Sequence, residues 1–166
     1  MCWGIYVVAD RPLPEVESGN AQFPQFALRQ LDGDSADLVR RATERRHVYY
    51  ASSWQGCGCG FAYGTESEHK EKLAFTEGEP VLEQITRDDR TSALASVDSL
   101  SRYLAQVVVD GQVSVYVVDE SDIGRQPSAR KEVEPSFFGG TAFDFGDGSA
   151  MFEPTSLFEI KAPPGA

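Results

Sequence analysis

The sequence predicts an α/β fold of the α+β kind, with a mixed sheet of about five to seven short strands and two main helices. Short runs of β-branched and aromatic residues recur along the chain. Two segments carry apolar residues at helical spacing, and turn signals separate the segments. The length of 166 residues fits a single globular domain, 1–166, which would bury about 70% of its unfolded surface.

The N-terminal part is expected to alternate strands with one helix. Residues Trp3 to Ala9 form an apolar run that predicts a buried strand. The segment 23–31 fits either a strand or a helix, and we prefer the strand. A turn and helix cap at Asp32 to Ser35 predict a short helix from about Ala36 to Arg45. A further strand is predicted from His47 to Ser53.

The second half opens with a charged segment, 64–90, which we interpret as a surface excursion with a helical turn at Val81 to Ile85. The clearest helix signal follows, with Ser96 at its N-cap. Its apolar face is Val97, Leu100, Leu104, Val107 and Val108. The remaining elements are expected to be strands at 113–118, 130–134 and 157–160, a hairpin over 143–152 and a frayed tail at 162–166.

Charge and hydropathy narrow the classes of partner. The net charge of -11 repels a phosphate backbone, so we expect no nucleic-acid partner. The apolar runs are far shorter than the roughly 20 residues of a membrane-spanning helix, so we expect no membrane partner. An odd number of cysteines, two of them too close together for a disulfide framework, and no secretory leader pattern favour a cytoplasmic location.

The run from Gly56 to Gly60 alternates glycine with Cys57 and Cys59 and is the most distinctive motif of the chain. Two thiolates from one tight loop, completed by Cys2 and by His69 or His47, would make a candidate zinc site, although the spacing is tighter than in usual zinc motifs. A reactive thiol is a second interpretation. The third, which we favour, is a structural one, in which glycines allow a close passage of backbones and the cysteines pack as small apolar groups.

Two other groups of residues are candidate contacts. Trp54 and Gln55, just before the cysteines, are placed to touch a ligand or partner, although a tryptophan beside a turn often caps a core. Four arginines form the most concentrated positive patch and are candidates for an anion or partner contact: Arg40, Arg41, Arg45 and Arg46. A solvated helix face, with Arg40 paired to Glu44, is the preferred interpretation of that patch.

These observations favour a small, non-catalytic binding or interaction module whose protein or small-molecule partner is not identified. No cofactor is expected, with zinc as the one candidate metal. The alternative is a cysteine-dependent protein, metal-binding or thiol-reactive, centred on the loop Gly56 to Gly60. The sequence leaves the oligomeric state open.

Overall fold

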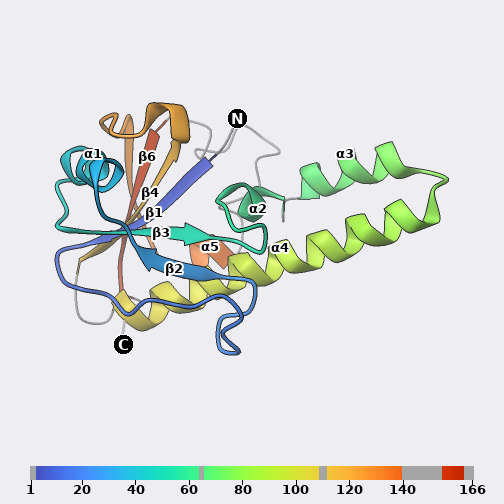
Figure 1. Cartoon of the computed structure of the whole chain (residues 1–166), viewed down its shortest axis with the longest axis horizontal. Helices are drawn as coiled ribbons and strands as arrows, with labels where there is room; N and C mark the ends of the chain where they lie inside the picture. Colours follow the sequence, from blue (N-terminus) through green and yellow to red (C-terminus); the bar gives the residue numbers. More distant parts are fainter. Residues whose placement is uncertain (1–2, 64–65, 109–111, 140–154, 163–166) are drawn as a thin grey trace.

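A computed structural model describes residues 3–63, 66–108, 112–139 and 155–162, excluding the side chains of 66–68 (Figure 1). The strands form one sheet in the order β2-β3-β1-β4-β6-β5. Neighbouring strands are antiparallel, apart from the parallel pair β5 and β6. The strands are β1 (Trp3–Ala9), β2 (Ala27–Gln30), β3 (His47–Ser52), β4 (Val113–Asp119), β5 (Ala129–Val133) and β6 (Thr155–Ile160). The mixed sheet of an α+β domain is thus confirmed.

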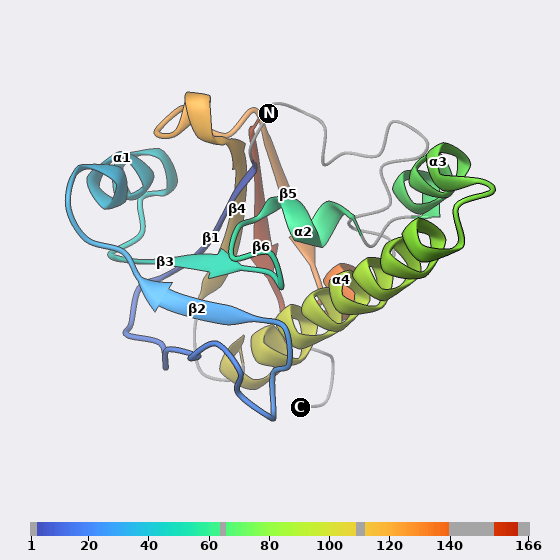
Figure 2. The same ribbon diagram turned by 45° about the vertical axis from the view of Figure 1, so that its right-hand side comes forward.

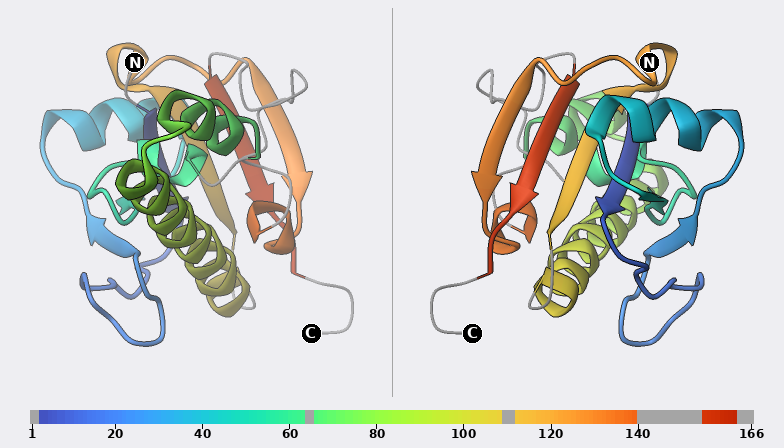
Figure 3. Two further views of the ribbon diagram at one scale, coloured as in Figure 1. Left: turned by 90° about the vertical axis from the view of Figure 1, so that its right-hand side faces the viewer. Right: turned by 90° about the vertical axis from the view of Figure 1, so that its left-hand side faces the viewer.

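Helices cover both faces of this sheet (Figure 3). Helix α1 lies against one face, and α4, with the short α2 and α5, lies against the other. The helices are α1 (Asp34–Thr43), α2 (Cys59–Ala62), α3 (Glu66–Thr76), α4 (Pro80–Val107) and α5 (Ser136–Gly139), with a 3₁₀ turn, η2 (Glu120–Asp122). Helices α1 and α4 are the two main helices expected, and α3 is an additional one.

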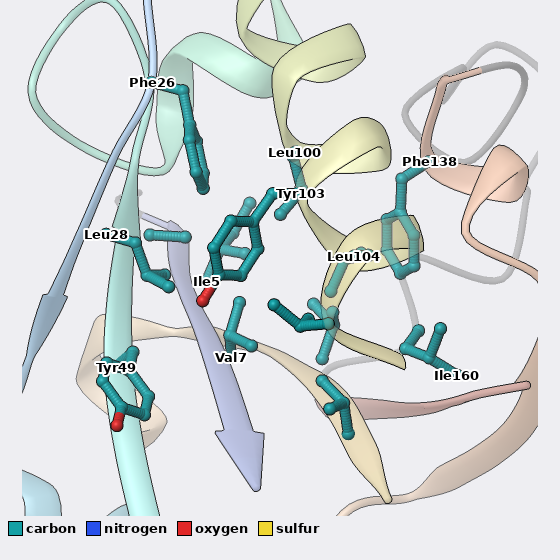
Figure 4. Close-up of a cluster of buried hydrophobic side chains, with 14 of the residues drawn as sticks. Ile5, Val7, Phe26, Leu28, Tyr49, Leu100, Tyr103, Leu104, Phe138 and Ile160 are labelled. Carbon is teal, nitrogen blue, oxygen red and sulfur yellow. The ribbon is translucent and has the colours of Figure 1, made fainter. Parts of the chain in front are cut away.

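The central strand β1 is buried on both faces, because each face carries a separate hydrophobic core. Ile5 and Val7 point toward α4, where they meet Leu100 and Leu104 (Figure 4). The alternating residues Tyr6 and Val8 point toward α1, into a cluster that includes Val39 and Ala42. The continuous apolar run of β1 thus follows from its position in the middle layer.

Several predicted strands differ from the structure in their extent. The strand proposed over 23–31 is shorter, since only Ala27–Gln30 pairs with β3. The carbonyls of Pro24 and Gln25 accept hydrogen bonds from serines of α4, so this stretch does not join the sheet. The predicted hairpin over 143–152 and the last residues of the tail, 163–166, lie outside the described residues.

Residues 66–90 of the charged segment are largely helical, which corrects the expectation of a single helical turn there. Helix α3 and the first half of α4 form a hairpin that projects beyond the sheet (Figures 1 and 2). Gly78, at φ +86°, reverses the chain, and Pro80 opens α4, where a missing N–H costs nothing. We call α3 with residues 80–92 the helical arm. Ser96 is therefore inside α4 and not its N-cap.

Although α4 is long, its sequence is rich in charged and polar residues. None of the helices in the part of the chain described above combines the length and apolar character that a bilayer crossing requires.

Candidate functional site

A pocket of about 750 Å³ opens where β2 begins and β3 ends. One wall is the loop 18–26 and the opposite wall is the turn 53–56 that follows β3. Trp54 and Gln55, the two contact residues expected from the sequence, both line this pocket. They therefore lie beside a cavity large enough for a small organic ligand.

The lining of this pocket combines polar and apolar side chains and contains a single charged residue, Arg29. The sheet register pairs Arg29 with Tyr50, so the two side chains stand together on one face. No aspartate or glutamate is among the described lining residues, although the chain carries 26 acidic residues. The Arg29 guanidinium makes no ion pair or hydrogen bond with any described residue. The described lining thus carries one accessible cation and no carboxylate, while the Glu120 carboxylate lies 3.4 Å from the hydroxyl of the lining residue Tyr50. The other polar side chains in the lining are Ser18, Asn20, Gln25, Ser52, Ser53, Trp54 and Gln55.

One buried serine of α4 holds both walls of the pocket. Ser96 Oγ lies 2.5 Å from the carbonyl oxygen of Gln25, to which it donates its proton. Ser96 Oγ in turn accepts a hydrogen bond from the Trp54 backbone N–H at 3.0 Å. The neighbouring carbonyl of Pro24 accepts a further hydrogen bond from Ser99 Oγ at 2.8 Å. The pocket is thus preformed by polar contacts to a rigid helix.

Gln25 adopts a backbone conformation that non-glycine residues seldom take, with φ +58°. The conformation aims its carbonyl at Ser96 on α4, while its side chain lines the pocket. Backbone strain of this kind persists where surrounding contacts impose it, and it is common at binding sites. The sequence gives no signal for it, because glutamine has no preference for that region.

The glycine and cysteine loop lies next to the pocket and is closed by a tight turn. Both the backbone N–H and the hydroxyl of Ser53 donate to the Cys57 carbonyl, at 3.0 and 2.7 Å. A Cβ on Gly58 would lie 2.2 Å from the Trp3 carbonyl oxygen, and one on Gly60 would lie 2.2 Å from Ser53 Oγ. Gly58 therefore allows a close passage of two backbones, whereas Gly60 leaves room for the side chains of Ser53 and Trp54.

The thiols of this loop are half-buried. Cys59 Sγ accepts a hydrogen bond from the Trp3 backbone N–H at 3.4 Å, and Cys57 and Cys59 are not joined in a disulfide. Of the other proposed zinc ligands, Cys2 lies outside the described residues and His69 is on α3. Among the residues that the structure describes, no three histidine, cysteine or acidic side chains gather in a group that could hold a metal ion.

The Tyr50 phenol lies between the glycine and cysteine loop and the carboxylate of Glu120. The Tyr50 hydroxyl accepts the Gly58 N–H at 3.3 Å and lies 3.4 Å from Glu120 Oε1. Burial raises the pKa of Tyr50, and the Glu120 carboxylate and, to a lesser degree, Cys57 raise it further. The charges acting on this phenol are therefore negative, whereas a reactive thiol is normally activated by a nearby cation.

The arginine cluster lies on and just after α1, which covers the other face of the sheet from α4 (Figure 3). Arg40 pairs with Asp37 at 2.6 Å and with Asp32 at 3.9 Å, not with Glu44 as expected. Arg45 forms an ion pair with Asp10, and Arg41 Nε donates to the Asp37 carbonyl at 3.3 Å. Arg46 is exposed. Acidic neighbours therefore offset part of the positive charge of this patch.

The sequence singled out Trp54 and Gln55 as candidate contacts but not Arg29 or Gln25, and it assigned Ser96 to a helix cap. Arg29 is polar and exposed in a short edge strand, which is the ordinary pattern of a solvated strand face. Its role at the pocket depends on the register between β2 and β3, which the sequence does not reveal. No protein-family model matches the chain, and searches of curated proteins and of solved structures return no match.

Proposed function

We propose that the protein is a non-catalytic binding module that holds a small anionic ligand in the pocket beside β2 and β3. The observation that carries the proposal is the unneutralised Arg29 in a pocket whose described lining has no acidic residue. In a chain of net charge -11, an anion approaches favourably only where acidic side chains are absent and a cation is exposed.

The chemistry of the lining suits a carboxylate or phosphate group. A guanidinium offers paired N–H donors that match two oxygens of such an anion. The amides of Gln25 and Gln55 and the hydroxyl of Ser52 surround the same space and supply orientation. Because Ser96 fixes both walls before binding, little ordering cost opposes association. We place the module in the cytosol, as its cysteine content favours.

Thermal unfolding of the purified chain with defined anions tests the proposal. The probes are inorganic phosphate, citrate, a sugar phosphate and a nucleoside monophosphate. A ligand at 100 times its dissociation constant stabilises the folded state by about 2.7 kcal/mol, which raises the melting temperature by several degrees. We expect at least one probe to do so, and Arg29→Gln to abolish the increase.

Arg46→Gln is the matched control, since Arg46 is also an exposed arginine but lies outside the pocket. It should retain the stabilisation in full. If both variants lose the same amount of this stabilisation, the anion binds only through the overall charge of the protein. The proposal is wrong if none of the four probes raises the melting temperature of the unmodified protein.

A second candidate function, a cysteine-dependent protein, is favoured by the hydrogen bond from the Trp3 N–H to Cys59, because such a donor stabilises a thiolate. Metal analysis of freshly purified protein and a native thiol titration test it. Stoichiometric zinc or iron that is lost in a Cys57→Ser, Cys59→Ser variant would support this function over the first. Unreactive thiols without metal would exclude it.

A further inference from the structure

The tip of the helical arm exposes four large apolar side chains, which we call the apolar tip: Phe75, Val81, Leu82 and Ile85. Phe75 exposes 84% of its surface and Val81 exposes 72%. Leu82 and Ile85 are three residues apart on α4 and share a face, next to the turn 77–79. Single exposed apolar residues are ordinary, whereas such a group indicates a contact surface.

These side chains are not needed to attach the arm to the rest of the protein. The contacts of the arm with Tyr63 involve other residues, since the Tyr63 hydroxyl donates to the Thr86 carbonyl at 3.3 Å. Lys72 lies 3.7 Å from the centre of the Tyr63 ring, in a cation–π contact. Tyr63 thus contacts both helices of the arm, and the far end of the arm projects beyond the sheet (Figure 1).

The charge around the tip defines the kind of partner. Residues 73–86 contain Glu77, Glu79 and Glu83 and no lysine, arginine or histidine. Glu77 and Glu83 also line a shallow groove of about 260 Å³ between α3 and α4, together with Leu73, Ala74 and Arg87. The tip therefore offers an apolar centre with an acidic border, which is complementary to an apolar surface bordered by lysine or arginine.

We propose that the apolar tip is a docking surface for a partner protein with a basic, partly apolar face. A second copy of the chain would bring two acidic tips together, each on a molecule of net charge -11. Nucleic acid and anionic bilayers would meet the same repulsion. A basic protein surface gains from both the apolar burial and the charge, and long-range attraction accelerates its association.

The apolar tip is distant from the proposed ligand pocket, so the two proposed sites are independent. Leu82 and Ser96 are separated by fourteen residues of one helix, which is about 21 Å along its axis. Failure of one site therefore leaves the other testable.

A defined probe can test the docking surface with the full chain. The probe is a fluorescent amphipathic helical peptide of leucine and lysine, and a leucine and glutamate peptide of equal length is its counterpart. Fluorescence anisotropy measures the binding of both peptides. We expect the basic peptide to bind, and a Phe75→Ser, Ile85→Ser double variant to weaken its binding about tenfold or more. A Glu77→Gln, Glu79→Gln variant should weaken it several-fold and reduce its dependence on salt.

Matched controls separate the tip from the general acidity of the protein. Leu94→Ser removes an exposed leucine of the same helix outside the tip, and Glu17→Gln with Glu134→Gln removes two charges elsewhere. Both should bind the basic peptide as the unmodified protein does. The proposal is overturned if these controls lose as much affinity as the tip variants, if the basic peptide does not bind, or if the acidic peptide binds equally well. Dimers in sedimentation that the double variant abolishes would assign the tip to self-association and would also overturn it.

Discussion

The two halves of α4 are one continuous helix with opposite relations to the fold. Over residues 93–107 most of its apolar side chains are buried against the sheet, with Leu100 and Leu104 fully enclosed (Figure 4), and Leu94 is an exposed exception. Over residues 80–92 only Thr86 is buried, while the leucine and isoleucine side chains near the start stand in solvent. Apolar residues at helical spacing therefore stabilise this domain in one half and are available to a partner in the other.

Alkaline pH should cause the largest loss of stability among these predictions, and the loss should affect the sheet and its covering helices. Burial raises the pKa of Tyr6 to about 12, with Glu120 adding to the shift, and burial likewise raises the pKa of Tyr116 to about 12. Their ordinary pKa is 10.0, so the unfolded chain loses these protons first. The stability they contribute is complete below about pH 10 and is lost as the pH rises toward about 12.

Circular dichroism during a titration with base measures this loss of structure. Tyr6→Phe is the sharpest variant, because it removes the ionisable group and keeps the ring that packs against Tyr50 and Tyr116. It should unfold at a higher pH than the unmodified protein. An unchanged unfolding pH in Tyr6→Phe would contradict the assignment of this transition to the buried phenols.

A matched pair of leucine substitutions compares the halves of α4 directly. Leu104→Ala removes a side chain with no exposed surface and should lower the free energy of unfolding by about 2–5 kcal/mol, through lost burial and the cavity left behind. Leu82→Ala, at the exposed end of the helix, should change it by no more than about 0.5 kcal/mol. Urea denaturation followed by fluorescence measures both, and similar losses would show that the tip is packed in solution.

The same contrast explains which parts of the fold could be predicted. Strands β1 and β4 were predictable because both faces of each are buried, so their sequences are continuous apolar runs. The first half of α4 was predicted only as a helical turn at Val81 to Ile85, because the apolar side chains there have no core to face and a charged segment without a buried stripe resembles a loop.

The residues of the pocket could be predicted only in part, for a different reason. Trp54 and Gln55 stood out because they precede an unusual glycine run, whereas Arg29 and Gln25 come from a separate part of the chain. Long-range hydrogen bonds and strand register bring these residues together, and neither leaves a periodic pattern. Ser96 was misread as a helix cap because a serine before an apolar stripe is the usual sign of one.

Ser96→Ala should have a smaller effect on stability than Leu104→Ala, but it should act at the pocket. The variant leaves the Trp54 N–H and the Gln25 carbonyl without their described hydrogen-bond partner, and an unsatisfied buried polar group costs about 1–3 kcal/mol. Because Ser96 sits where the exposed half of α4 meets the buried half, the loss of its two hydrogen bonds should loosen both pocket walls while leaving the arm helical.

Hydrogen exchange of Ser96→Ala followed by mass spectrometry should show faster exchange at 18–26 and 53–56 and no change in α3. Ser92→Ala, one turn earlier on α4, is the control that should leave both regions unchanged, because its hydroxyl makes no hydrogen bond with a described residue. Faster exchange throughout the arm in Ser96→Ala would mean that the two halves of the helix unfold together, and the distinction between them would then fail.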